Sequence, residues 1–82
     1  MEHENIFDAI KKEATAILDV DPDLITVDAM LGETLDADSV DLIEIAGVVE
    51  QKFGVQLEDH ELHDLVTVGD FVSLVARKRG LP

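Results

Sequence analysis

Three stretches of this 82-residue chain place apolar side chains at intervals of three and four residues. That spacing puts them on one face of an α-helix, so the sequence predicts helices over residues 5–18, 38–53 and 67–79. A shorter helix or turn is expected around residues 59–65. One-faced helices must bury that face against each other. The pattern therefore predicts an all-α fold, a small four-helix bundle with three longer helices and one short helix.

Capping residues mark the expected helix boundaries. The predicted pairs at the helix starts are Asn5 with Asp8, Asp38 with Asp41, and Thr67 with Asp70. Residues 19–22 should end the first helix, while Gly54 and Gly80 should end the second and the last. The connection over residues 20–37 has no clear periodicity, and a loop of this length is often functional. We expect it to be pinned to the core by Leu24, Ile25, Met30, Leu31 and Leu35.

The second helix should have two unlike faces. Its core face would carry Leu42, Ile45, Ala46, Val49 and Phe53. Its outer face would carry Asp41, Glu44, Val48 and Gln51, with Val40 and Gly47 beside them. Small apolar residues inside an acidic frame indicate a docking surface.

Ser39 is the strongest candidate for a functional residue. It falls in the first turn of the second helix, where the positive end of the helix dipole and unpaired N–H groups favour a phosphate on the serine oxygen. Helix-start physics alone favours the simpler interpretation, in which Ser39 is an ordinary residue of the capping region. A hydrolase is not indicated, because the sequence has no Gly-x-Ser-x-Gly element.

The segment Asp38-Ser39-Val40, followed by Glu44, resembles the Asp-Ser-Leu motif of acyl carrier proteins, whose serine carries 4′-phosphopantetheine. The resemblance extends over nearly the whole chain without gaps. The other matching positions are Leu31, Leu35, Phe53-Gly54, Leu57, Leu65, Thr67-Val68 and Phe71. Two positions depart from the usual Gly-Ala-Asp-Ser-Leu sequence, with Asp36 in place of the glycine and Val40 in place of the leucine. They leave open whether this is a housekeeping or a specialised carrier.

The resemblance implies a single acyl carrier domain over residues 1–82 that is a carrier and not an enzyme. A phosphopantetheinyl transferase, using coenzyme A and Mg²⁺, would attach the arm to Ser39. The arm would then carry acyl groups as thioesters and present them to acyl-transfer and chain-elongating enzymes that have basic docking patches. The pathway could be fatty-acid, polyketide or nonribosomal synthesis, or D-alanine transfer. The implied recognition residues are Asp38, Val40, Asp41, Glu44, Val48 and Glu50. Candidates for an acyl pocket, or for ordinary core packing, are Leu42, Ile45, Ala46, Leu62 and Leu65.

The net charge of −13 argues against nucleic-acid or anionic-membrane binding and favours basic partners. With no cysteine in the sequence, thiol chemistry must come from an attached group. No apolar run reaches membrane length, and we expect a cytoplasmic monomer.

No dedicated metal site is predicted. His60 and His63 are two ligands without a third, and residues 19–30 lack the glycine and the final glutamate of a calcium loop. An alternative function of another class is a non-carrier acidic module that binds a basic partner through the second helix.

Overall fold

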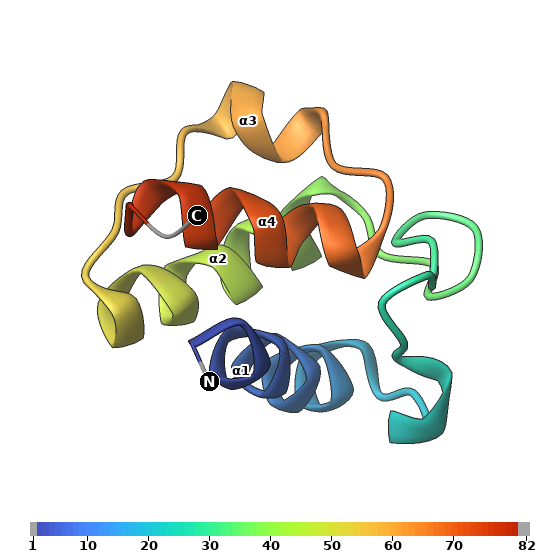
Figure 1. Cartoon of the computed structure of the whole chain (residues 1–82). Helices are drawn as coiled ribbons and strands as arrows, with labels where there is room; N and C mark the ends of the chain where they lie inside the picture. The colour runs from blue at the N-terminus through green and yellow to red at the C-terminus, as the bar shows by residue number, and fades with distance from the viewer. Residues whose placement is uncertain (1, 81–82) are drawn as a thin grey trace.

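A computed structural model describes residues 2–80 of the chain, and of Glu2 only the backbone (Figure 1). It contains α1 (Glu2–Leu18), the 3₁₀ turn η1 (Pro22–Leu24), α2 (Ser39–Phe53), α3 (Asp59–His63) and α4 (Val68–Lys78). Three of the four α-helices are long, and the described residues form no strand beyond an isolated bridge between Met30 and Thr67. The predicted all-α bundle with three longer helices and one short helix is confirmed.

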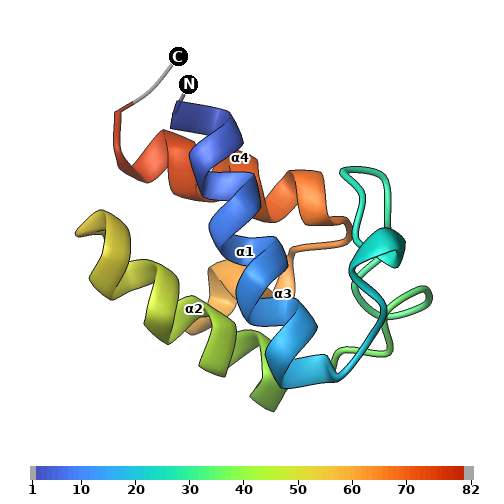
Figure 2. The same cartoon turned by 90° about the horizontal axis from the view of Figure 1, so that it is seen from below.

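The core lies where α1 packs against both α2 and α4, while α3 packs against α2 (Figures 1 and 2). Within the described residues, no polar or charged side chain is buried. The largest fully buried side chains come from all three long helices and from the loop before α2. They are Ile6, Ile10, Ile25, Leu35, Ile45, Val49, Val68, Phe71 and Val75. Burial of this aliphatic set is the main stabilising contribution to the fold.

The predicted capping of α2 and α4 is confirmed. At α2, the Asp41 N–H donates to Asp38 Oδ1 at 2.9 Å, and the Asp38 N–H donates to Asp41 Oδ2 at 3.2 Å. At α4, Thr67 and Asp70 make the same reciprocal pair, at 3.0 Å in both directions. Gly54 ends α2 with φ = 66°, a left-handed conformation that glycine adopts without steric cost.

Two predictions about the first half of the chain are wrong. Asn5 does not cap α1, because the helix begins at Glu2 and Asn5 lies inside it. The residues before Asn5 have no feature that opposes a helix, so a cap-like residue did not mark the true start. Leu24 does not pin the loop to the core. It is 50% exposed at the end of η1, and the neighbouring Ile25 takes the buried position.

The loop between η1 and α2 is held to α4 by backbone hydrogen bonds. The N–H groups of Val68 and Gly69 donate to the carbonyls of Ala29 and Val27, at 3.0 and 2.9 Å. The Leu31 N–H donates to the Val66 carbonyl at 2.8 Å. These contacts fix the path by which the loop reaches the start of α2.

The start of α1 and the end of α4 lie at one end of the bundle, and the start of α2 lies at the other end (Figure 2). The end of α4 is also tied to its neighbours. Arg79 Nη1 donates to the Phe53 carbonyl at 2.7 Å, and Lys78 pairs with Glu61 at 2.9 Å. The basic residues at this end therefore hold α2 and α3 in place, in addition to their favourable position at a helix C-terminus.

Candidate functional site

Ser39 is the first residue of α2, and its side chain is exposed. Among residues 2–80, its hydroxyl group has no hydrogen-bond partner. The backbone N–H groups of Ser39 and Val40 have none in this range either, because the Asp38 carboxylate caps the N–H of Asp41. A free hydroxyl therefore lies beside two unpaired donors at the positive end of a helix, a donor set that suits a phosphate group.

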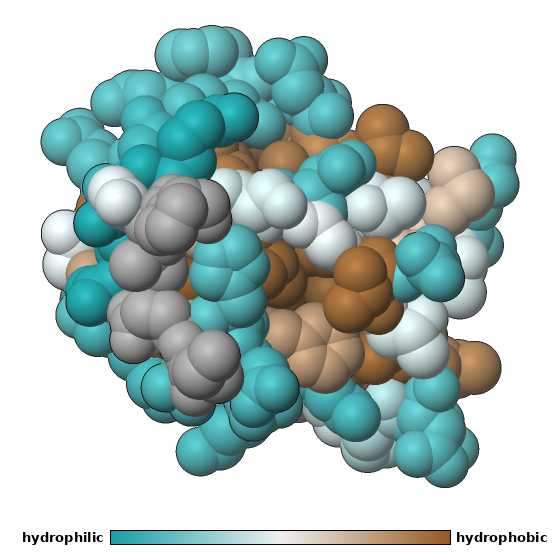
Figure 3. Space-filling model, in the orientation of Figure 1, coloured by the Kyte–Doolittle hydropathy of each residue, from teal (hydrophilic) through white to brown (hydrophobic). Residues whose placement is uncertain are grey.

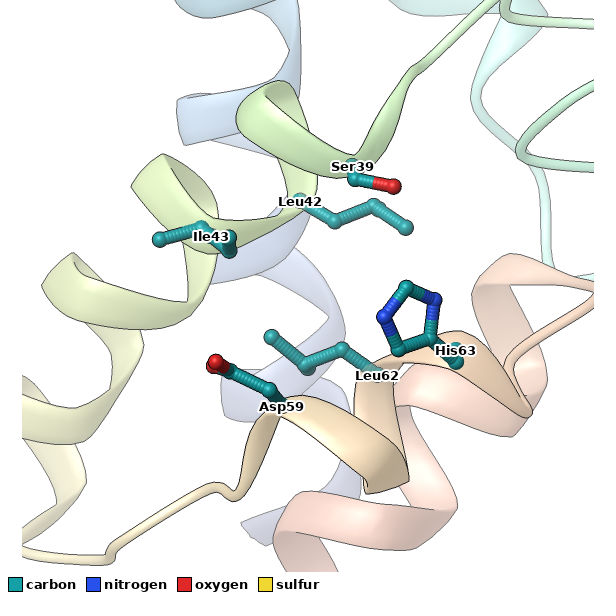
Figure 4. A pocket seen from close by; sticks show the side chains of 6 residues that line it. All are labelled: Ser39, Leu42, Ile43, Asp59, Leu62 and His63. Atoms are coloured by element: carbon teal, nitrogen blue, oxygen red, sulfur yellow. The ribbon is translucent and has the colours of Figure 1, made fainter.

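A small hollow separates Ser39 from α3 (Figure 4). Its lining consists of Ser39, Leu42, Ile43, Asp59, Leu62 and His63. Figure 4 shows the His63 ring across the hollow from the Ser39 hydroxyl, with the Leu42 side chain between them. The cavity volume is about 60 Å³, which leaves room for only a few water molecules.

Two of the five predicted acyl-pocket residues, Leu42 and Leu62, line this hollow. Ile45 and Ala46 lie in the closed core instead, where they are 1% and 3% exposed. Leu65 is half-buried and lines a different hollow between α3 and α4. Since the cavity is too small to hold a long acyl chain, these residues would enclose one only if the helices moved apart.

Three lining residues were missed by the sequence reasoning. Ile43 lies one turn after Ser39 and is 50% exposed, so helical spacing from Ser39 could have found it. Asp59 and His63 come from α3, and no sequence pattern places a residue of one helix against another. Their position depends on how α3 packs.

The predicted outer face of α2 is exposed. Asp38, Val40, Glu44 and Val48 are all exposed, and Asp41 is half-buried. The apolar members are exposed to 62% at Val40 and 39% at Val48. Ile43, which is 50% exposed, is a third exposed apolar residue of α2, and Glu44 lies between Val40 and Val48 along the helix.

Glu50, also predicted to recognise partners, has a structural contact. It is half-buried, and its Oε2 accepts a hydrogen bond from the Leu57 N–H at 2.7 Å. This bond fixes the turn between α2 and α3. Glu61 further holds α3, and the pKa of its carboxyl is lowered by the hydrogen bond from the Glu58 N–H and then by the Lys78 ammonium group.

A larger hollow, of about 400 Å³, lies away from Ser39, between the first part of α1 and the first part of α4. Phe7, Val27 and Val72 are among its lining residues. In Figure 3, apolar residues gather where these helices meet, surrounded by hydrophilic surface. Its lining includes the hydroxyl of Ser73, but Ser73 lies in the middle of α4, where the backbone N–H groups are used within the helix, and not at a helix start.

In the described range, no group of three or more His, Cys, Asp or Glu side chains is placed to hold a metal ion. Among the same residues, no helix combines the length and the apolar character needed to cross a bilayer. Asp21, part of the acidic run after α1, caps η1, where its Oδ1 accepts from the Asp23 N–H at 2.9 Å.

Comparison with known proteins agrees with this geometry. Residues 8–75 match the family model of the phosphopantetheine attachment site. The acyl carrier protein of Petrotoga mobilis is 37% identical over 78 residues, covering 95% of this chain and 92% of the relative. Those of Thermotoga maritima and Lactobacillus acidophilus are both 39% identical, over 94% and 98% of this chain and 95% and 100% of the relatives. The chain belongs to the acyl carrier protein family.

Proposed function

We propose that this chain carries 4′-phosphopantetheine on Ser39 and serves as a carrier for the enzymes that use it, not as a catalyst. The observation that supports the proposal is the start of α2, where an exposed hydroxyl without a partner in residues 2–80 lies beside two unpaired N–H groups. The match to the phosphopantetheine attachment site over residues 8–75 is consistent with it. The proposal takes residues 1–82 as one carrier domain, of which residues 1, 81 and 82 lie outside the described structure.

The attachment is a phosphoryl transfer from coenzyme A. The Ser39 oxygen forms a bond to the phosphorus nearer the pantetheine, the pyrophosphate P–O bond breaks, and adenosine 3′,5′-bisphosphate leaves. The hydroxyl proton passes to a base of the transferase or to water. Once bound, the arm supplies the thiol that holds an acyl group as a thioester. Ser39 supplies the oxygen, and the first turn of α2 supplies N–H donors beside the new negative charge.

The partners implied by this function are a phosphopantetheinyl transferase and acyl-transfer or chain-elongating enzymes. We propose that they dock on the outer face of α2, where Asp38, Asp41 and Glu44 surround Val40 and Val48. The net charge of −13 would steer basic patches toward this face and raise the association rate. Glu50 would contribute indirectly, through the turn that it holds.

The first test is an intact mass measured after incubation with coenzyme A, Mg²⁺ and a broad-specificity phosphopantetheinyl transferase. The wild type should gain the mass of one phosphopantetheine, and Ser39→Ala should gain none. Ser73→Ala is the matched control, because Ser73 is the other serine of the sequence and is also exposed, on α4. A folded, unmodified wild type that gains no mass would favour the alternative, an acidic module that binds a basic partner through α2.

The docking face can be tested by charge reversal. Replacing both Asp41 and Glu44 by Lys should slow loading on the order of tenfold at low salt. The control reverses Glu4 and Asp8, which are exposed on α1 and change the net charge by the same amount. Equal loading rates in the two double variants would mean that net charge, and not the α2 face, governs recognition. Circular dichroism of each variant checks that the helices remain formed.

A further inference from the structure

The position of His63 opposite Ser39 is fixed by several contacts of α3. Its neighbour Leu62 is 5% exposed and anchors the helix in the core. Glu61 pairs with Lys78 at 2.9 Å and accepts from the Glu58 N–H at 2.9 Å. His63 itself is exposed and lines the hollow. An imidazole is therefore held on a well-anchored helix, across the hollow from Ser39, and a phosphate on the Ser39 oxygen would have to extend past the Leu42 side chain to reach it (Figure 4).

We propose that His63 binds the phosphodiester carried on Ser39 and so holds the base of the arm against α3. The inference rests on the proposed attachment at Ser39. A neutral imidazole donates one N–H and an imidazolium donates two, whereas a phosphodiester offers only acceptor oxygens. A hydrogen bond between imidazolium and phosphodiester is charge-assisted and is stronger than one between neutral groups.

The lining of the hollow makes His63 the group best placed for this contact. Among the six lining residues, it alone can carry a positive charge. Asp59 is the other ionisable group there, and Figure 4 shows its carboxylate directed toward Ile43 and away from the His63 ring. His60 lies one turn earlier on α3, is exposed, and does not line the hollow.

The contact should depend on pH. Histidine changes its charge between pH 5 and 8, and a phosphodiester stays singly negative throughout this range. Besides His63, the ionisable groups on the turns of α2 and α3 next to the hollow are the imidazole of His60 and a set of carboxylates, of which Asp59 alone lines the hollow. The carboxylates are Asp38, which caps α2, with Asp41 and Glu44 on α2, and Asp59, Glu61 and Asp64 in or directly after α3, of which Glu61 is paired with Lys78. The contact should therefore be stronger when the imidazole is charged than when it is neutral.

The test is a ³¹P NMR titration of the loaded protein between pH 5 and 8, after mass spectrometry has established loading. Because the phosphodiester does not itself titrate there, any sigmoidal change in its shift reports a neighbouring group that does. The wild type should show such a change, His60→Gln should retain it, and His63→Gln should remove most of it. His60→Gln is the matched control, since both histidines are exposed residues of α3.

Two results would overturn the inference: a flat titration in the wild type, or an equal titration in His63→Gln. Neither can be confused with failure of the attachment itself, which appears earlier as the absence of a mass gain. His63→Lys adds a second measurement. A lysine keeps its charge across this range, so this variant should hold the ³¹P shift near the wild-type low-pH value at every pH. A lysine variant that matches His63→Gln instead would also count against a charge-assisted contact.

Discussion

The starts of α2 and α4 have the same cap and opposite exposure. Both are closed by a reciprocal pair, Asp38 with Asp41 and Thr67 with Asp70, with bond lengths between 2.9 and 3.2 Å. At α4, the next two N–H groups donate to carbonyls of the loop between η1 and α2. At α2, the corresponding two N–H groups are unpaired in the described structure.

The first residues of the two helices differ in the same way. Val68 begins α4 and is 0% exposed, whereas Ser39 begins α2 with an exposed hydroxyl. A capping pair thus decides where a helix begins, but not whether its first turn can accept a ligand. That second property is set by the loop over residues 25–37, which covers the start of α4 and leaves the start of α2 open.

The largest expected effect on stability comes from replacing the first residue of each helix, Val68 of α4 and Ser39 of α2, by alanine. Val68→Ala should lower the free energy of unfolding by about 2 kcal/mol, from two lost methyl contacts and the cavity left behind. Ser39→Ala, at the equivalent position of α2, should change it by less than about 0.5 kcal/mol. Urea unfolding of both variants measures the difference. Similar losses would mean that the start of α2 is as important for packing as the start of α4.

A smaller effect is expected from the caps. Thr67→Ala should cost about 1 kcal/mol, because the Asp70 N–H loses its acceptor. Asp38→Ala removes the equivalent bond to the Asp41 N–H but also relieves repulsion in a chain of net charge −13, so its cost should be smaller. Unfolding at 0.05 and 1 M salt separates the two contributions. The two variants should lose more nearly equal unfolding free energy at 1 M salt than at 0.05 M salt. If the difference between their losses does not change with salt, charge repulsion is not its cause.

Asp36, in the turn that leads into α2, should give a stabilising substitution. Its φ of 54° is left-handed, a conformation that costs free energy for any residue with a Cβ. Asp36→Gly should raise the free energy of unfolding by about 0.5 kcal/mol, after the greater entropy of glycine in the unfolded chain is subtracted. Asp64→Gly is the control, since Asp64 is also exposed but has φ = −85°. The Asp64→Gly variant should have a lower free energy of unfolding than the wild type. If Asp36→Gly also lowers the free energy of unfolding, backbone strain at Asp36 is ruled out.

The smallest expected effect concerns how the stability contributed by the capping pair at the start of α4 depends on pH. Hydrogen bonds from the N–H groups of Thr67 and Val66 lower the pKa of the Asp70 carboxyl in the folded protein. The stabilisation is therefore complete above the unfolded-state pKa and is lost as pH falls through the lower folded-state value. The difference in unfolding free energy between the wild type and Asp70→Ala should narrow as pH falls from 7 toward 3. A constant difference over this range would contradict the pKa shift as its cause.

The sequence predicted those features that depend on neighbours along the chain. Helical spacing identified α2 and α4, and the capping pairs Asp38–Asp41 and Thr67–Asp70 placed their starts. The same reasoning failed at Asn5, because a residue able to cap a helix can also lie within one. It also failed at Leu24, since a loop without periodicity gives no sign of which apolar residue turns inward.

The contacts that complete the site join residues far apart in sequence. Nothing in the sequence near Ser39 indicates that His63 faces it across the hollow. The bond from Arg79 to the Phe53 carbonyl, 26 residues away, and the bond from the Leu57 N–H to Glu50 likewise have no sequence signature. The second helix could therefore be predicted in detail, whereas its surroundings required the packed structure.

The placement of the helix ends described above has a practical consequence for surface-based measurements. The start of α1 and the end of α4 lie together, at the end of the bundle opposite the start of α2 (Figure 2). A biotin tag or a fusion partner joined before α1 or after α4 would therefore orient the molecules on a sensor chip with Ser39 toward the solution. Kinetics recorded on such a chip should report docking at the α2 face without obstruction by the attachment.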